Sequence, residues 1–206
     1  MLKVWGRTNS LNVQKVLWTI AELDIPYERI EAGLQFGVVK TADYLAMNPN
    51  ALVPTIDDGG FVLWESNVIV RYLAARYGMG TLCPEGVRER FLAERWMDWQ
   101  ACALSPAMSP AFMGLIRRVP QFSDPATIDE ARQRVGSWLT ILDGHLATRE
   151  FVNGERLTMG DIPVGVAVHR WYAMPVARDP HPNVERWFAR LKERPGYRAH
   201  VELPLS

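Results

Sequence analysis

The sequence predicts a protein of two domains: an α/β domain over residues 1–78 and an all-helical domain over residues 87–206. Strand and helix signals alternate in the first segment, whereas the second has apolar residues at helical spacing and no convincing strand. Residues 79–86 contain two glycines and a proline, which are typical of a linker. At 206 residues the chain is long enough to bury a core in each domain.

The first domain is predicted to follow the order β-α-β-α-β-β-α around a central sheet. Val13, Val16 and Ile20 fall at helical spacing, and the helix that they define ends before Pro26. Asp58-Gly59-Gly60 lies between two short apolar runs and predicts a hairpin, because Asp and Gly tolerate a positive φ. The remaining segments follow from the same patterns: strands at 2–5, 27–30, 55–57 and 61–63, and helices at 41–47 and 65–77.

The second domain is predicted to contain helices only. Val135, Trp138 and Leu142 illustrate the helical spacing of its apolar residues. We expect a first long helix that ends near Leu104 and a separate short helix that begins near Met113. The full set of expected helices is 87–104, 113–119, 128–146, 162–171 and 184–191.

Charge and hydropathy exclude several classes of protein. Lysine plus arginine and aspartate plus glutamate both number 23, so the net charge is zero and no basic block marks a nucleic-acid binder. The first residues lack the apolar segment of a signal peptide. No stretch reaches the roughly 18–20 apolar residues that a membrane helix requires. We therefore expect neither a nucleic-acid partner nor a membrane association.

The cysteines and histidines point away from disulfide and metal chemistry. Cys83 and Cys102 lie nineteen positions apart and form no C-x-x-C motif, which favours reduced thiols in a cytoplasmic protein. The four histidines lack the spacing of a metal-binding pair, so we expect no metal site. No glycine-rich motif for a nucleotide is present.

Three short motifs each allow a structural and a functional interpretation. Thr158-Met159-Gly160-Asp161 has the pattern of a capping box, in which the threonine hydroxyl accepts from a helix amide while Asp161 accepts from the Thr158 amide. Pro54 either forms a turn before an edge strand or follows a cis bond that exposes the backbone of Val53 to a peptide ligand. Glu65 and Ser66 either cap the next helix or hold the ammonium and carboxylate of a ligand.

The segment of residues 6–12 joins the first strand to the first helix and is rich in polar side chains. Thr8, Asn9, Ser10 and Asn12 are more than a simple helix cap needs. An anion at this helix start would be stabilised by the Ser10 hydroxyl, backbone amides and the helix dipole. A free thiol has a pKa of about 8.5, and a shift of roughly two units would make it mostly thiolate at neutral pH. The loop therefore predicts activation of a thiol that belongs to another molecule.

Taken together, these motifs resemble those of the cytosolic glutathione S-transferases, in particular bacterial members with Ser or Asn rather than Tyr in the active loop. The resemblance covers nearly the whole chain and includes the capping box. It rests also on Asn9 to Val16, Asn48-Pro49-Asn50 followed by Val53-Pro54, and Trp64 to Asn67 followed by Ile69, Tyr72 and Leu73. It implies a thioredoxin-like first domain that binds glutathione as co-substrate, and a homodimer.

The resemblance also implies roles for individual residues. Ser10, assisted by Asn12, would activate the glutathione thiol, with Thr8 as the other hydroxyl that could face the sulfur. Glutathione would be held by Lys40, Val53, cis Pro54, Glu65 and Ser66. A hydrophobic electrophile would contact Trp96, Trp99, Met108, Phe112, Met113 and Ile116. Val39 and Leu52 depart from the family, which often has His at the first position and Lys, Arg or Gln at the second.

The resemblance therefore predicts a detoxifying glutathione transferase in which the thiolate attacks an electrophilic carbon. Two alternatives remain open. The first is glutathione-dependent reduction of a disulfide or peroxide, although Ser10-Leu11-Asn12-Val13 has no cysteine of its own for dithiol exchange. The second is a non-catalytic interaction module of the same fold. The presence of Ser10, Asn12, Glu65 and Ser66 favours catalysis.

Overall fold

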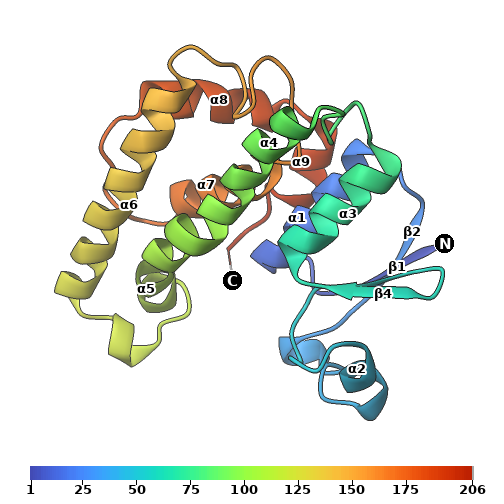
Figure 1. Cartoon of the computed structure of the whole chain (residues 1–206). Coiled ribbons are helices and arrows are strands. Elements are labelled where there is room, and N and C mark those ends of the chain that lie inside the picture. The colour runs from blue at the N-terminus through green and yellow to red at the C-terminus, as the bar shows by residue number, and fades with distance from the viewer. Residues whose placement is uncertain (206) are drawn as a thin grey trace.

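The computed structural model describes residues 1–205 and confirms the predicted fold class. A four-stranded sheet with its helices forms the N-terminal thioredoxin-like domain, and helices alone follow (Figure 1). The exact domain limits of 1–78 and 87–206 stay predictions. The N-terminal elements are β1 (Leu2–Trp5), α1 (Leu11–Glu22), β2 (Tyr27–Ile30), the 3-10 turn η1 (Leu34–Phe36), α2 (Ala42–Met47), β3 (Thr55–Asp58), β4 (Phe61–Trp64) and α3 (Ser66–Tyr77).

The sheet has the strand order β2-β1-β3-β4. Strands β1 and β2 are parallel, with Leu2 opposite Tyr27, whereas β3 is antiparallel to both β1 and β4. The predicted hairpin joins β3 to β4, and Gly59 and Gly60 both have positive φ angles of 64° and 95°. Helices α1 and α3 pack against each other, and their apolar side chains share one core with the sheet. This core fixes where α1 begins, and the first polar residues of α1 belong to the candidate site.

The C-terminal part is built from helices. The elements are α4 (Val87–Trp99), the π-helical turn η2 (Gln100–Leu104), α5 (Ser105–Leu115), the 3-10 turn η3 (Pro120–Phe122), α6 (Pro125–Leu146), α7 (Asp161–Ala173), α8 (Pro182–Lys192) and α9 (Pro195–His200). Helix α7 lies in the middle of this group, and its residues from Asp161 to Val168 are buried (Figure 1). None of the helices within residues 1–205 is both long enough and apolar enough to cross a membrane.

Two helix predictions were wrong. The expected break between Leu104 and Met113 is absent, because α4, η2 and α5 form one continuous helical segment. Proline has no amide hydrogen to donate within a helix, and the wider π turn lies immediately before Pro106. The short helix α9 was not anticipated, because only Tyr197 of its residues is buried and six residues give little periodicity.

Helix α1 also joins the two parts of the molecule, since it packs against α3 on one side and against α7 and α9 on another. Trp18 is fully buried there and meets the Tyr197 ring edge-on, with 5.2 Å between centroids. Its indole nitrogen donates to Glu22 at 2.7 Å, and Glu22 accepts from Arg194 of the α8–α9 turn at 2.8 Å. The orientation of α1 relative to the helical part is therefore held by both packing and charge.

The capping box at the start of α7 forms in part. Asp161 accepts from the Thr158 amide at 2.9 Å, as predicted. The Thr158 hydroxyl donates to Asp161 at 3.2 Å and caps no helix amide, so that half of the prediction was wrong. Asp161 also accepts from the Val152 amide at 2.9 Å and from the Trp187 indole at 3.0 Å. This carboxylate is a fully buried structural centre of the helical part.

Candidate functional site

Ser10 lies at the start of α1 with its hydroxyl unused by the helix. It is the N-cap residue in extended conformation, but its side chain accepts no helix amide. Only 7% of the residue is exposed. The loop before it is held close to α1, because a Cβ on Gly6 would come within 2.4 Å of the Val13 side chain. The hydroxyl thus faces the positive end of the α1 dipole without an intrahelical partner.

A small cavity of about 40 Å³ lies beside this helix start. The Val53–Pro54 peptide bond in its wall is cis, as the functional interpretation expected. Within residues 1–205 neither the amide nor the carbonyl of Val53 makes a backbone hydrogen bond. The turn is anchored by Asn48, whose amide donates to the Leu52 carbonyl at 2.9 Å and to Thr55 at 3.0 Å. The lining consists of Asn12, Asn48, Asn50, Leu52, Val53, Pro54, Trp64, Glu65 and Ser66.

Glu65 and Ser66 lie where β4 passes into α3. Glu65 has φ = 72°, a left-handed conformation that L residues rarely adopt. Such strain persists where the surroundings impose it, and it is common at ligand sites. Ser66 follows as the first residue of α3 and is buried. The free amides at this helix start can donate hydrogen bonds to a carboxylate, and the Glu65 carboxylate can accept them from an ammonium.

Lys15 is a buried cation that the sequence interpretation missed. Its ammonium donates to Ser66 at 3.4 Å and to Asn67 at 3.1 Å, so it ties α1 to the start of α3. Burial, followed by repulsion from Arg170, lowers the pKa of Lys15 to about 7. The sequence held a signal for it, because Lys15 stands among the apolar residues of the predicted first helix. In the structure the residue is only 3% exposed.

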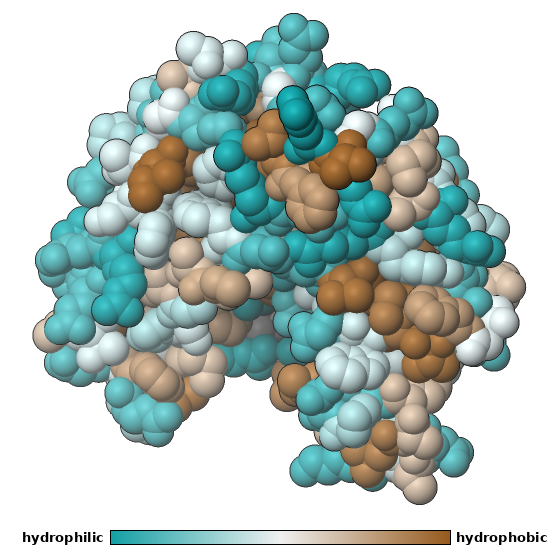
Figure 2. Space-filling view, viewed as in Figure 1, coloured by the Kyte–Doolittle hydropathy of each residue, from teal (hydrophilic) through white to brown (hydrophobic). Residues whose placement is uncertain are grey.

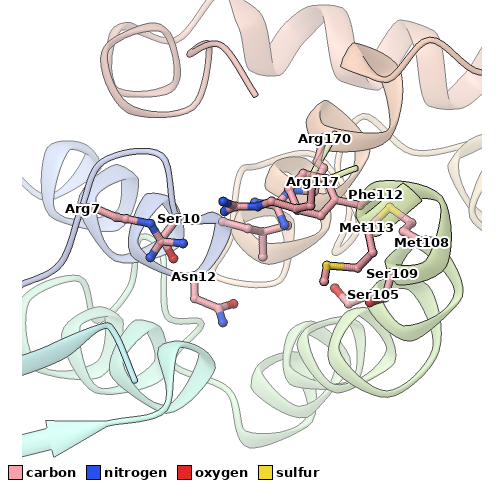
Figure 3. Close-up of a pocket in the computed structure, with 11 residues that line it drawn as sticks. Arg7, Ser10, Asn12, Ser105, Met108, Ser109, Phe112, Met113, Arg117 and Arg170 are labelled. Atoms are coloured by element: carbon pink, nitrogen blue, oxygen red, sulfur yellow. The ribbon is translucent and has the colours of Figure 1, made fainter. Parts of the chain in front are cut away.

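A larger cavity of about 360 Å³ adjoins the first, and Asn12 lines both (Figure 3). Three predicted electrophile contacts, Met108, Phe112 and Met113, reach it from α5. Ser10 and Asn12 reach it from the opposite wall, at the start of α1. The complete lining is Arg7, Ser10, Leu11, Asn12, Ser105, Met108, Ser109, Phe112, Met113, Arg117 and Arg170.

Several predicted site residues lie away from both cavities. Thr8 and Ile116 line neither, and Lys40 is exposed just before α2. Trp96 and Trp99 were expected at the electrophile site, but the structure places them elsewhere. Trp96 packs against Trp99 and the His145 ring, and Trp99 packs against Trp138 of α6. The two indoles belong to the contact between α4 and α6, because they point to that side of α4 rather than along α5.

Six residues that line this cavity were absent from the predicted site: Leu11, Ser105, Ser109 and three arginines. Arg7 comes from the β1–α1 loop, Arg117 from the segment after α5, and Arg170 from the last turn of α7 (Figure 3). The Arg170 guanidinium lies 4.2 Å from the centroid of the Phe112 ring, and the Arg117 guanidinium lies 5.6 Å from it. Residues so far apart in the chain form no motif, so the sequence does not show that they share a cavity.

The fold and the site together define a class of protein. A thioredoxin-like domain is joined to a helical domain, and the polar start of α1 faces two adjoining cavities. Residues 1–75 match the family "Glutathione S-transferase, N-terminal domain", and residues 125–190 match "Glutathione S-transferase, C-terminal domain". The chain belongs to the glutathione S-transferase family.

Individual relatives agree with this assignment. The chain is 43% identical over 208 residues to glutathione S-transferase GstB of Escherichia coli K12, with 100% of both chains covered. The structure of the theta class glutathione S-transferase of Xanthomonas axonopodis pv. citri with glutathione bound is similar, with a TM-score of 0.93 and 42% identity. That match covers 100% of this chain and 99% of the other. A delta-class glutathione transferase of Nilaparvata lugens is 26% identical, with a TM-score of 0.88 and coverage of 98% and 93%.

The site offers no metal-binding group. Within residues 1–205 no three His, Cys, Asp or Glu side chains lie close enough together to hold a metal ion. Apart from the Glu65 carboxylate, the polar side chains of the two cavities are hydroxyls, amides and guanidiniums. These groups bind and stabilise anions.

Proposed function

We propose that this protein is a glutathione transferase in which Ser10 holds the glutathione sulfur as a thiolate. The thiolate attacks an electrophile in the larger cavity, whose apolar part contacts Met108, Phe112 and Met113. One observation carries the proposal: the Ser10 hydroxyl, free of any capping bond, lines the larger cavity two residues before Asn12, which lines both cavities. The Xanthomonas relative described with glutathione bound supports the choice of thiol.

The small cavity suits the peptide part of glutathione. Its γ-glutamyl end carries an ammonium and a carboxylate, which Glu65 and the start of α3 at Ser66 would bind. The cysteinyl part would pair with the unbonded backbone of Val53 beside Pro54. The sulfur would then reach Ser10, with Asn12 donating from the first turn of α1. We retain Lys40, which is exposed just before α2 and does not line the cavity, as the proposed contact for the glycyl carboxylate.

The protein contributes proximity and electrostatic stabilisation to the reaction. A hydrogen bond to a charged group is worth about 1.5–3 kcal/mol, and a hydroxyl aimed at the thiolate supplies such a bond. The α1 dipole adds a smaller term of the same sign. Both effects increase the thiolate fraction at neutral pH, and the thiolate is the nucleophile.

The first test is Ser10→Ala. We expect kcat/KM with a neutral aryl halide at neutral pH to fall about 10- to 100-fold, the equivalent of the lost charged hydrogen bond. The pKa of bound glutathione, followed by the ultraviolet absorbance of the thiolate, should rise. Ser109→Ala is the matched control, because it removes a hydroxyl from the opposite wall of the same cavity. An unchanged thiol pKa in Ser10→Ala would remove Ser10 from its role.

The reductase alternative is not favoured, because the active loop offers no cysteine for a mixed disulfide with glutathione. Comparing turnover of an aryl halide with turnover of a glutathione mixed disulfide separates the two activities. The interaction-module alternative predicts no thiol-dependent activity and no retention on immobilised glutathione.

We further propose that the protein acts as a homodimer in cytoplasmic detoxification. Exposed apolar side chains on α3 and α4 support the dimer: Val68, Val87, Phe91 and Leu92. Figure 2 shows hydrophobic surface over the region where Figure 1 places α4, α3 and β4. Unpaired Cys83 and Cys102 are compatible with a reducing compartment. Cell fractionation with a specific antibody tests the location.

A further inference from the structure

The larger cavity carries three positive charges and no negative one. Arg7, Arg117 and Arg170 line it together with serines, an asparagine and apolar side chains. The ion pairs formed within residues 1–205 include none of these three arginines. Arginine is mostly exposed in proteins and is almost never fully buried without a paired charge, whereas these three are partly buried. Three unpaired guanidiniums around one cavity therefore need a reason.

The positive charges of the three arginines repel one another. Burial lowers the pKa of Arg170 to about 10, and repulsion from Arg117 and Arg7 acts in the same direction. The pKa of Arg7 is likewise lowered, by burial and by Arg117. Buried Lys15 adds a further positive charge on the Arg170 side, and the carboxylate that acts on Lys15 is Glu65 of the smaller cavity. The cavity is thus a region of positive charge in a chain with no net charge.

The guanidiniums are nevertheless held in place. Arg170 and Arg117 both lie against the ring of Phe112, at 4.2 Å and 5.6 Å from its centroid. Such cation–π contacts orient the planar groups and leave their N–H donors free to bind another ligand. The Nε atom of Arg7 is buried without a hydrogen-bond partner among the described residues. The cavity therefore combines fixed donors with an apolar floor of Phe112, Met108 and Met113.

We propose that the electrophile of this enzyme carries a carboxylate, which Arg117 and Arg170 bind beside Phe112 while its apolar part lies on the methionines. This refinement rests on the proposed function. A carboxylate matches the planar fork of a guanidinium with two parallel hydrogen bonds. It also relieves the mutual repulsion of the arginines, which a neutral hydrophobic electrophile cannot do. Arg7, on the Ser10 side, completes the positive rim of the cavity.

The reaction itself is a substitution. The glutathione thiolate forms a C–S bond to the electrophilic carbon as the C–halogen bond of the substrate breaks. The halide leaves with the bonding electron pair, and the thiol proton has already passed to solvent. The carboxylate keeps its charge throughout and serves only to position the carbon opposite Ser10 and Asn12.

A matched substrate pair tests the proposal. Para-(chloromethyl)benzoate and para-(chloromethyl)benzamide have nearly the same shape and differ in charge. For each, kcat/KM is divided by the uncatalysed rate constant with glutathione. We expect this ratio to favour the benzoate by about 10- to 100-fold, the value of a charge-assisted hydrogen bond. Preference for the benzoate should decline with added salt, because ions screen the attraction. Equal ratios, or preference for the benzamide, would overturn the proposal.

Variants link this preference to the arginines. Arg117→Gln should lower the benzoate-to-benzamide preference at least tenfold, and Arg117→Lys should restore part of it. Arg118→Gln is the matched control, since it removes the same charge from the next residue, which is exposed and lies outside the cavity. If Arg118→Gln has the same effect as Arg117→Gln, the preference comes from general charge and the assigned site is wrong.

The alternative is that the arginines bind a carboxylate of glutathione rather than one on the electrophile. The pattern of inhibition distinguishes the two. Para-methylbenzoate lacks a leaving group and should compete with the chloromethyl substrate; competition with glutathione alone would overturn the proposal. If neither chloromethyl compound is turned over, the proposed function fails. Calorimetric titration with para-methylbenzoate and para-methylbenzamide then still decides whether the cavity prefers the anion.

Discussion

Asp161 is a buried carboxylate that accepts four hydrogen bonds. Two come from Thr158, one from the Val152 amide and one from the Trp187 indole, so three separate segments converge on this side chain. Burial raises the pKa of Asp161 to about 6, even though every hydrogen bond opposes the shift. The residue is remote from both cavities, and its effect is therefore on stability.

We expect Asp161→Asn to lower the free energy of unfolding by about 1–3 kcal/mol. The reason is that the amide nitrogen of the new side chain is a donor and faces groups that themselves donate to Asp161. Urea denaturation measures the change. Asp129→Asn is the control, since Asp129 lies exposed on α6 beside Arg132 and such surface pairs contribute about 0–1 kcal/mol. Equal losses in the two variants would contradict the structural role of Asp161.

The raised pKa also sets a pH dependence. The folded state keeps the Asp161 proton up to about pH 6, whereas the unfolded chain releases it near its ordinary pKa of about 3.9. The contribution is therefore fully present at low pH and is lost as pH rises through 6. The stability advantage of the wild type over Asp161→Asn should narrow between about pH 4 and pH 6 and stay constant above.

At the scale of one element, the continuous segment α4–η2–α5 determines which side chains reach the larger cavity. Pro106 and Pro110 cannot donate to carbonyls four residues earlier, and the π turn η2 lies at the start of the affected stretch. Beyond η2, Met108 and Phe112 share one face of α5, four residues apart, and both line the cavity. The indoles of α4 lie before η2 and pack against α6 instead.

Gly114 allows the segment after α5, which carries Arg117, to pack closely against that helix. A Cβ at this position would come within 2.1 Å of the Phe122 carbonyl oxygen, so η3 can pack on α5 only because position 114 is glycine. Gly114→Ala should cost about 1–3 kcal/mol of stability by overpacking and should also displace Arg117. The benzoate preference would then fall along with the denaturation midpoint.

Gly144→Ala in α6 is the matched control, because a Cβ there meets no atom within 4 Å. Alanine favours a helix over glycine by about 0.8–1 kcal/mol, so this variant should be neutral or more stable. A stability loss in Gly144→Ala equal to that in Gly114→Ala would contradict the role of the contact with η3, because helix propensity alone predicts a gain in both variants.

For the whole molecule, the predicted homodimer places α3 and α4 at a twofold interface. Phe91 is 62% exposed on α4, and burying it against a second copy removes apolar area from water. Phe91→Asp should therefore weaken the dimer at least tenfold in sedimentation equilibrium. Ile141→Asp on α6 is the control: Ile141 is 53% exposed but lies on another helix. A wild-type monomer, or equal effects of both variants, would refute this interface.

Part of this structure could be predicted from the sequence alone, because it depends on interactions between neighbouring residues. The element order, the Asp58-Gly59-Gly60 hairpin and the polar start of α1 each depend on neighbouring residues, whereas the cis bond before Pro54 was implied only by the family resemblance. Such features follow from backbone preferences and short periodicities, which a sequence displays directly. The resemblance of these motifs to one family was sufficient to predict the fold.

Only the tertiary structure decided which side chains share a cavity. Arg7 lies more than a hundred positions from both Arg117 and Arg170, and the three meet because α1 packs against α7 while η2 contacts both α5 and α7. The same packing turned Trp96 toward α6 and away from the site. Distances between remote residues depend on the whole set of helix contacts. The sequence by itself therefore determined the fold and the polar loop before α1, and packing determined the charge of the larger cavity.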